Sequence, residues 1–382
     1  MKLSALFLSF LMSVNVMADE GPYLYPPYPE QHTPHVFTQQ EIREMEAFDE
    51  PFEKVDHLQT ALMQTPVKSQ GRRGTCSIFS STAILEYNLK LLGLEAGDPD
   101  LSEQWLEYIT AAQRGSEGSW SYYNFDQYGV YGYLKESDWQ YNGGTWYPYN
   151  EDYWEFSATP VEKALFEMSC KDLKGTGFFD GCLIGQMNPG FLNLDDQTLL
   201  ERNAQFLEWK NKAKTLLETL KLTITSDFVY SNADVQADLD RGEVLALDVT
   251  FFYEAWNHGR GRSMEGLTID SNLWAQGIVS YPDSRSMDYL KSQESDVRAG
   301  HSIVVVGYDP DIVISRQVQD QQGNMITVES KGVYYFKNSW GPDSFGVDFT
   351  LKGESLPGFG MIAMDYAHEF GSFYKMIIEK AE

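Results

Sequence analysis

The sequence predicts an α+β fold, because helical patterns fill the chain before residue 243 and strand patterns dominate after it. Apolar residues recur at helical spacing over 76–93, and further helical patterns lie at 101–112, 160–168 and 197–220. Continuous apolar runs typical of buried strands lie at 303–308 and 333–337, and a strand-like segment lies at 243–252. Helices and strands that are separated along the chain are typical of α+β domains.

The first helix begins beside a cysteine. Thr75 is a competent N-cap, Cys76 falls in the first turn and Gly93 is the expected stop. Two adjacent apolar stripes cover most of the circumference: Ile78, Thr82, Leu85, Leu89 and Leu92 form one, and Phe79, Ala83, Tyr87 and Leu91 form the other. We therefore expect this helix to be buried inside a domain.

The position of Cys76 allows two interpretations. Unpaired backbone N–H groups and the positive end of the helix dipole favour a thiolate at a helix N-terminus, which would make Cys76 a nucleophile. Alternatively, a free cysteine beside a buried helix is a packing residue. The helix alone favours packing.

Two later motifs reverse that preference. AGHSIVVVGYD surrounds His301 and GVYYFKNSWG surrounds Asn338, while QGRRGTC ends at Cys76. Together they resemble the papain-like cysteine peptidases, whose bacterial members often carry QGxRGTC. The resemblance implies that Cys76 is the nucleophile, His301 its base, Asn338 the residue that orients the imidazole, and Gln70 an oxyanion-hole donor. It also implies that Trp340 covers the Asn338 side chain.

The resemblance further implies a two-lobed fold with a cleft between a helical lobe carrying Cys76 and a β-rich lobe carrying His301 and Asn338. Recognisable blocks are scattered from residue 55 to about 365. The family's histidine and asparagine follow the cysteine by about 130 to 150 residues, whereas the gaps here are 225 (301 − 76) and 262 (338 − 76). We assign the excess to a helical insertion at about 155–225.

Two positions depart from the family's motif. Arg73 stands where the family usually has a cysteine, so the usual disulfide of the active-site loop cannot form. Ser77 stands where the family usually has an aromatic residue. Whatever that aromatic ring contributes to the substrate groove is therefore missing.

The two late strands predict an antiparallel hairpin. If His301 faces Asn338, facing residue numbers add up to 639, and Val306 then faces Val333. The apolar stretch stays in register, with Tyr308 opposite Lys331, and the segment 322–324 supplies a turn. This hairpin would bring the base and its orienting residue together.

The N-terminal part predicts export. Residues 1–18 combine Lys2, an apolar stretch and a small-residue end at Ala18, which is typical of a secretory signal peptide. No other apolar run is long enough to span a bilayer, so we expect a secreted or periplasmic protein. Residues 19–54 form a proline-rich arm or short propeptide, and 55–382 form the catalytic domain. The arm either blocks the cleft until it is cut or packs permanently on the domain surface.

The remaining cysteines are Cys170 and Cys182, which flank a glycine-rich turn. Because an exported protein meets oxidising conditions, we expect them to form a disulfide. The alternative is an unpaired structural thiol at each position.

Charge and composition exclude several partners. With 56 acidic and 29 basic residues the net charge is −27, which repels nucleic acid and anionic membranes. We assign no cofactor and no metal, since His32 and His35 lie in the proline-rich arm without a cysteine nearby. His258 is interpreted as a loop residue. The aromatic-rich segment 120–154 is interpreted as core and groove wall, with a carbohydrate-binding face as the alternative.

The function that these motifs predict is peptide-bond hydrolysis through an acyl-thioester intermediate, with peptides or proteins as substrates. Two alternatives stay open. One is an inactive papain-like scaffold that binds peptide or glycan, and the other is acyl transfer to an amine from the same site.

Overall fold

The computed structural model describes residues 54–71, 73–95, 97–114, 118–143, 187–259, 261, 269–283, 298–319 and 324–381. All of them lie in the compact unit Val36–Glu382. Several sequence predictions fall outside the described residues and stay predictions. They are the signal peptide 1–18, the arm 19–54 apart from Lys54, the helix 160–168, the turn 322–324 apart from Asn324, and the Cys170–Cys182 disulfide.

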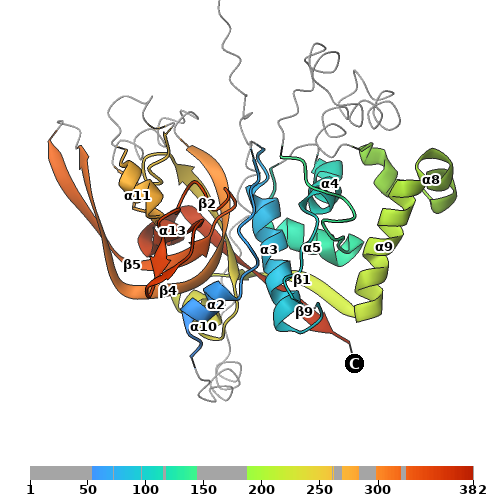
Figure 1. Ribbon diagram of the computed structural model, residues 1–382, viewed down its shortest axis with the longest axis horizontal. Helices are drawn as coiled ribbons and strands as arrows, with labels where there is room; N and C mark the ends of the chain where they lie inside the picture. Colours follow the sequence, from blue (N-terminus) through green and yellow to red (C-terminus); the bar gives the residue numbers. More distant parts are fainter. Residues whose placement is uncertain are drawn as a thin grey trace, which may run out of the picture. The chain divides into compact units, whose positions relative to one another are not determined.

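Helices dominate the described residues before 222 (Figure 1). They are α2 (His57–Leu62), α3 (Cys76–Leu91), α4 (Glu103–Arg114), α5 (Ser121–Tyr131), the 3-10 helix η3 (Pro189–Asn193), α8 (Asp196–Arg202) and α9 (Ala204–Leu220). Three short helices follow among the strands: α10 (Asn232–Asp240), α11 (Ser271–Ala275) and α13 (Met364–Phe370). Within the described ranges, no helix is long and apolar enough to cross a membrane.

Strands dominate the rest and form a seven-stranded sheet in the order β1-β9-β2-β4-β5-β8-β3. The strands are β1 (Leu222–Val229), β2 (Leu245–Phe252), β3 (Ile278–Val279), β4 (Arg298–Gln319), β5 (Met325–Lys337), β8 (Phe359–Ala363) and β9 (Gly371–Lys380). All neighbours are antiparallel except β3 and β8. Two short strands, β6 (Thr350–Leu351) and β7 (Glu354–Ser355), pair separately. The fold is therefore α+β, as the sequence predicts.

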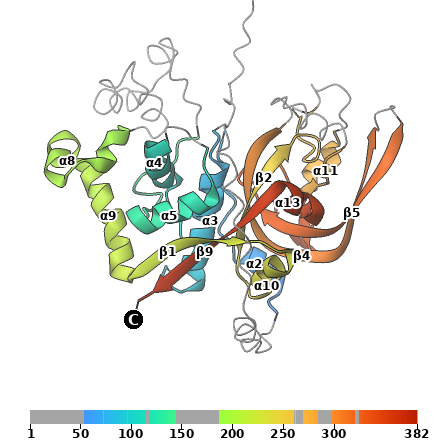
Figure 2. The same cartoon turned by 180° about the vertical axis from the view of Figure 1, so that it is seen from behind.

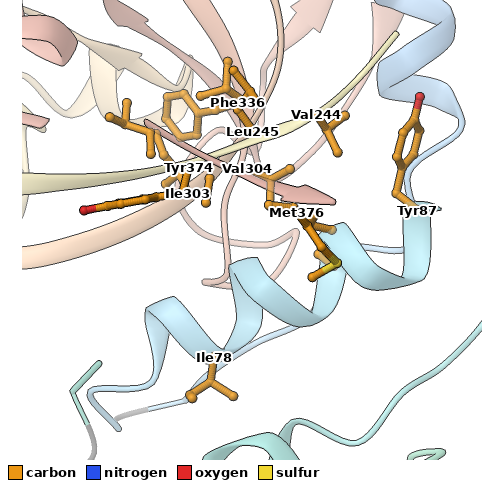
Figure 3. Close-up of a cluster of buried hydrophobic side chains, with 14 of the residues drawn as sticks. Ile78, Tyr87, Val244, Leu245, Ile303, Val304, Phe336, Tyr374 and Met376 are labelled. Carbon is orange, nitrogen blue, oxygen red and sulfur yellow. The ribbon is translucent and has the colours of Figure 1, made fainter. Parts of the chain in front are cut away.

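Helix α3 lies between helices α4 and α5 on one side and the sheet on the other (Figures 1 and 2). It contacts α4 and α5 as well as β2, β4 and β9. Ile78 and Tyr87 belong to the buried cluster that also holds Val304 of β4 and Met376 of β9 (Figure 3). The predicted burial of this helix is confirmed for most of its length, whereas Leu91 and Leu92 at its end are 53% and 50% exposed.

Helix α5 was not predicted as a helix, because its aromatic residues and Gly129 obscure the helical pattern. Gly129 is required by packing, since a β-carbon there would collide with the Ile224 carbonyl of β1. Phe125 and Tyr128 are completely buried. These two rings are therefore core, as expected, while Tyr122 and Tyr131 are partly buried and pack against the core.

The helix predicted at 197–220 is broken in two by Asn203. Its backbone is extended, with φ −158° and ψ 86°, which ends α8. Its side-chain oxygen then accepts a hydrogen bond from the Phe206 N–H at 3.0 Å and caps α9. Asparagine favours caps over helix interiors because its side chain competes for backbone hydrogen bonds.

The hairpin of β4 and β5 forms, but its predicted register is wrong. Val305 faces Phe336, so facing numbers add up to 641 (305 + 336) instead of 639 at the end that carries the site. A shift by two preserves the face on which each side chain lies. His301 and Asn338 therefore interact as diagonal neighbours instead of lying directly opposite.

The register changes again toward the tip of the hairpin. Val333 faces Asp309 instead of Val306, and Lys331 faces Val313 instead of Tyr308. Irregularities in β4 after Val305 and after Asp309 place extra residues in that strand. Nothing in the apolar pattern of the sequence marks these bulges.

Gly132 ends α5 in a conformation that side chains rarely adopt, and it gives a test of this packing. Its φ is +75°, and an added β-carbon would run into the Ala213 carbonyl of α9. We expect Gly132→Ala to lower the free energy of unfolding by roughly 3 kcal/mol or more, from backbone strain plus the collision. Gly97→Ala is the matched control, because Gly97 has the same φ of +75° with no atom within 4 Å. It should cost about 1 kcal/mol in urea unfolding. Equal losses would show that α5 and α9 do not pack as described.

Candidate active site

Cys76 is the first residue of α3 and is partly exposed. Thr75 occupies the N-cap position as predicted, but its side chain does not cap the helix. Its hydroxyl instead lies 2.7 Å from the Tyr141 hydroxyl. The predicted cap is therefore correct in position and wrong in its hydrogen bond, because Tyr141 offers the hydroxyl another partner.

Burial raises the pKa of the Cys76 thiol to about 12. Hydrogen bonds from the backbones of Ser302 and Ser77 act in the opposite direction, while the negative charge of Asp248 adds to the increase. Ser302 directly follows His301 in β4. The thiol is therefore hydrogen-bonded to the strand that carries the predicted base.

His301 and Asn338 are in direct contact. His301 Nε2 lies 2.9 Å from Asn338 Oδ1, and both side chains are buried. Asn338 Oδ1 also accepts the Ser339 N–H at 2.8 Å, which fixes the amide orientation. Because this oxygen only accepts, His301 carries its proton on Nε2. Nδ1 is then the ring atom that can take a proton.

Aromatic rings enclose the His301 imidazole. Trp340 stacks on it with ring centroids 4.6 Å apart and planes at 24°, and Trp256 contacts it edge-on at 5.1 Å. Trp340 thus covers the imidazole of His301, the ring that Asn338 contacts. We expected it to cover the Asn338 side chain. Burial lowers the pKa of His301 to about 4, the hydrogen bond to Asn338 opposes this, and His258 lowers it further.

Gln70 lies in the loop before α3 and is buried. Its Oε1 accepts a hydrogen bond from Ser339 Oγ at 2.7 Å, and its Nε2 donates to the Arg73 carbonyl at 2.7 Å. These bonds fix which end of the amide is the donor. An amide nitrogen carries two hydrogens, so one remains for a further acceptor.

The Gln70 loop is bound to the segment that follows β5. The Gln70 N–H donates to the Ser339 carbonyl at 2.9 Å, and the Gly341 N–H donates to the Lys68 carbonyl at 3.1 Å. Ser69 and Trp340 form a β-bridge between these two hydrogen bonds. The predicted oxyanion donor is therefore held against the residue next to Asn338.

A buried ionic cluster anchors the start of this loop to the helices. Lys68 Nζ lies 2.8 Å from Glu86 of α3, 2.9 Å from Glu103 of α4 and 2.8 Å from Asp100. Lys337 of β5 lies nearby and donates to Thr65 Oγ1 at 3.0 Å. Burial lowers the pKa of Lys337 to about 8. Lys68, Glu86, Glu103 and Lys337 line a small cavity that also reaches Asn338.

Arg73 makes ionic contacts where the family usually has a disulfide. Its guanidinium lies 3.0 Å from the Glu107 carboxylate of α4, with side chains only 1% and 0% exposed. It also donates to Gln104 at 3.2 Å and to the Asn142 carbonyl at 2.9 Å. The active-site loop is therefore fastened to α4 by charge and hydrogen bonds.

Ser77 is buried and does not line an open surface. Its hydroxyl lies 2.8 Å from the Ser119 hydroxyl, which in turn donates to Asn124 of α5 at 2.8 Å. The residue that replaces the expected aromatic side chain thus links α3 to the start of α5.

The four predicted site residues lie at the start of α3, on β4, in the loop before α3 and directly after β5. His301 contacts Asn338 directly, Gln70 reaches that segment through Ser339, and Cys76 reaches β4 through the Ser302 backbone.

Sequence reasoning missed two further residues. Asp248 interrupts the apolar run LALDVTFF of β2, which was a signal of a buried polar group that was not used. His258, interpreted only as a loop residue, packs against Trp340 at a centroid distance of 6.2 Å.

Comparisons with known proteins give matches only among solved structures. No protein-family model and no curated protein sequence matches the chain. One structural match is Cwp84, a surface-layer-associated protein of Clostridium difficile, solved as its cysteine protease and lectin-like domains. It has a TM-score of 0.47 and 16% identity over 87% of this chain and 53% of that chain. The present chain therefore spans about half the length of that structure.

Two further matches cover most of both chains. Xylellain, a cysteine protease from Xylella fastidiosa, has a TM-score of 0.47 and 15% identity over 87% of this chain and 92% of that one. The bromelain protease from Ananas comosus has a TM-score of 0.40 and 16% identity over 85% and 98%. All three of these structures are described as proteases. Their TM-scores and identities are too low to assign an activity.

The buried pair of Arg73 and Glu107 gives a stability test. Arg73→Met leaves the Glu107 carboxylate buried without its cation, so we expect the free energy of unfolding to fall by about 3–5 kcal/mol. The double variant Arg73→Met/Glu107→Met should recover most of this loss.

Lys214→Met is the matched control for that test, since Lys214 and Glu218 form an exposed ion pair at 3.7 Å with side chains 68% and 65% exposed. It should change the stability by less than about 0.5 kcal/mol in urea unfolding. A similarly small effect of Arg73→Met would contradict a structural role for the buried pair.

Proposed function

We propose that the chain is an exported cysteine peptidase that hydrolyses peptide bonds with Cys76 as nucleophile, His301 as base, Asn338 as the orienting residue and Gln70 as an oxyanion donor. The observation that carries the proposal is the 2.9 Å contact between His301 Nε2 and Asn338 Oδ1. This contact leaves Nδ1 of His301 as the basic ring atom. The next residue of β4, Ser302, hydrogen-bonds the Cys76 thiol through its backbone.

The residues support a two-step reaction. His301 Nδ1 takes the thiol proton while Cys76 Sγ attacks the carbonyl carbon of the substrate. The resulting oxyanion accepts hydrogen bonds from the Cys76 backbone N–H and the remaining Gln70 amide hydrogen. His301 then protonates the leaving amine, which leaves an acyl-thioester on Cys76. Water, deprotonated by His301, hydrolyses that thioester and restores the thiol.

The electrostatics favour coupled charges at this site. Burial raises the pKa of Cys76 and lowers that of His301, so each charge is disfavoured by itself. Transfer of the proton from thiol to imidazole creates both charges together, and their attraction offsets part of the desolvation cost. Asn338 adds to this by accepting a hydrogen bond that favours imidazolium.

Two other functions use the same site differently. An acyl transferase would pass the acyl group to an amine instead of water, and an inactive scaffold would only bind peptide or glycan. The oriented imidazole favours an active site over a scaffold. Analysing reaction products by mass spectrometry with and without an added amine separates hydrolysis from transfer.

Export and the role of the N-terminal arm belong to the same proposal. The signal peptide 1–18 would direct the protein to the exterior or periplasm. The arm would then either block the substrate cleft until it is cut or stay packed on the domain surface.

Substitutions of Cys76 and His301 test the chemistry directly. Cys76→Ala should abolish peptide hydrolysis. Asn338→Ala should keep a measurable residual activity, because losing the orientation of the imidazole costs less activity than losing the nucleophile. His301→Ala should slow labelling of Cys76 by a vinyl-sulfone peptide at pH 6 by at least about tenfold, because the thiol loses its base and each pKa unit changes the thiolate fraction tenfold.

Labelling is measured by mass mapping of the Cys76 peptide. His368→Gln is the control. His368 is a half-buried histidine that lies 2.7 Å from the Tyr334 hydroxyl and is not assigned to the site. Undiminished hydrolysis by Cys76→Ala would rule out the mechanism. Equal labelling of Cys76 in wild type, His301→Ala and His368→Gln would also rule it out.

Substitution of Gln70 tests the oxyanion hole. Gln70→Ala should lower kcat by roughly 10² to 10³ with a smaller change in KM, since the lost donor acts on the transition state. Ser339→Ala removes only the hydrogen bond to Gln70 Oε1, so we expect a decrease of about tenfold or less. An unchanged kcat for Gln70→Ala would exclude it from the oxyanion hole.

A further inference from the structure

Asp248 is a buried carboxylate at the junction between the helices and the sheet. It lies on β2, opposite Ser302 of β4 and Ser372 of β9, and it is 6% exposed. In the described part of the chain, no basic side chain lies within ion-pairing distance of it. A buried carboxylate without a cation is costly, so its hydrogen-bond partners must hold it in place.

Helix α5 supplies two of these partners. The Ser121 N–H donates to one carboxylate oxygen of Asp248 at 2.8 Å, and the Ser121 hydroxyl donates to the other at 2.6 Å. Trp120, at the N-cap position of α5, makes no side-chain cap. Asp248 therefore caps this helix from a strand 127 residues away, where the positive end of the helix dipole favours a carboxylate.

Ser302 connects this carboxylate to the Cys76 helix. Its hydroxyl lies 2.5 Å from the Ser80 hydroxyl of α3 and 3.1 Å from the Ser121 hydroxyl, which itself donates to Asp248. An ionised carboxylate only accepts hydrogen bonds, so the Ser121 hydroxyl donates to it, and the row of hydroxyls formed by Ser80, Ser302 and Ser121 ends at Asp248. The backbone of the same Ser302 hydrogen-bonds the Cys76 thiol.

We propose that Asp248 is a positioning residue for the Cys76–His301 site, which holds β4 in register with α3 through Ser302 and with α5 through Ser121. This inference rests on the proposed function, because it assigns Asp248 to the reaction of Cys76. The carboxylate touches neither substrate nor the reacting sulfur. It acts through the strand that carries His301 and through its charge.

The charge of Asp248 reaches the nucleophile. It raises the pKa of Cys76, since a nearby negative charge disfavours the thiolate. Burial raises the pKa of Asp248 itself to about 6, against the hydrogen bonds of Ser121 and Ser302. Asp248 is therefore mostly ionised at pH 7.5 and mostly protonated at pH 5, so its effect on Cys76 disappears at the lower pH.

The titratable groups next to Asp248 are Cys76 of α3 and His301 of β4, whereas α5 presents Ser121 and β9 presents Ser372. His301 is the base proposed for Cys76, so its protonation also affects alkylation. Because wild type and Asp248→Asn share this histidine, the difference between their alkylation profiles reports the charge of Asp248.

The test compares Asp248→Asn, Asp248→Ala and Ser302→Ala in the full-length protein. Iodoacetamide alkylation of Cys76 is followed by mass mapping between pH 5 and pH 8, and peptide hydrolysis is followed in parallel. Asp195→Asn is the matched control. Asp195 also caps a helix, because its carboxylate accepts the Thr198 N–H at 2.9 Å at the start of α8, and it is not assigned to the site.

Asp248→Asn keeps the shape and loses the charge. We expect Cys76 alkylation at pH 7.5 to rise at least about threefold over wild type, and the two proteins to agree within about twofold at pH 5. Hydrolysis should fall less than in Asp248→Ala, because the amide oxygen can still accept one of the two hydrogen bonds from Ser121. Asp195→Asn should match wild type throughout.

The other two variants lose the bridge. Asp248→Ala should lower kcat by about tenfold or more, since displaced catalytic groups lose near-attack geometry. Ser302→Ala keeps the charge of Asp248 and should lower kcat by about tenfold. Because the Ser302 hydroxyl lowers the pKa of Asp248, its loss should move the pH at which alkylation changes upward. This variant serves if Asp248→Ala does not fold.

The outcomes separate this inference from the peptidase proposal. If wild type hydrolyses no peptide but the alkylation profiles of wild type and Asp248→Asn diverge between pH 5 and pH 7.5, the peptidase function is wrong and the role of Asp248 stands. If hydrolysis is present but Asp248→Asn alkylates like wild type at every pH and Ser302→Ala retains full kcat, Asp248 is only a structural residue and the inference is overturned.

Discussion

The contact of helix α3 with strand β4 is the constraint on which the candidate site depends. Cys76 begins the helix, His301 lies on the strand, and 225 residues separate them along the chain (301 − 76). Because α3 is enclosed by α4, α5 and three strands of the sheet, it cannot shift relative to β4 without opening the core. Hydroxyl contacts such as the 2.5 Å pair of Ser80 and Ser302 add direction to an otherwise apolar interface.

Two buried charge clusters surround the loop that leads to Cys76. Lys68 binds the start of the loop to Glu86 and Glu103, and Arg73 binds its end to Glu107. The Arg73–Glu107 pair lies away from water, where breaking it leaves a charge uncompensated, whereas the Lys68 side chain is 24% exposed. Such a loop can hold hydrogen-bond donors in fixed positions before a substrate arrives, which is the condition for electrostatic stabilisation of an oxyanion.

The sequence was informative where a residue's role depends on its neighbours in the chain. The helix after Cys76, the strand 245–252 and the sequence motifs around His301 and Asn338 could all be recognised from local patterns. The break at Asn203 and the bulges of β4 could not, since a single cap or an inserted residue leaves the apolar pattern almost unchanged. Helix α5 was missed because Gly129 interrupts its helical pattern. This glycine makes room for β1, which lies almost a hundred residues later in the chain.

The same distinction applies to the candidate site. The contact of His301 with Asn338 follows from motifs that each carry their own signal. Asp248 has no such motif, and its meaning depends on Ser121 and Ser302, which arrive from other elements. A single acidic residue in an apolar strand was the one visible sign that something polar had to be satisfied there.

Arg73, in the loop before Cys76, affects how the chain folds under oxidising conditions. A loop cysteine in place of Arg73 would stand three residues from Cys76 and compete for it during oxidative folding. As it is, the next cysteine along the chain is Cys170, 94 residues later (170 − 76). Cys76 thus has no second cysteine near it in the sequence, and the loop acquires its shape from contacts that need neither an oxidant to form nor an isomerase to correct.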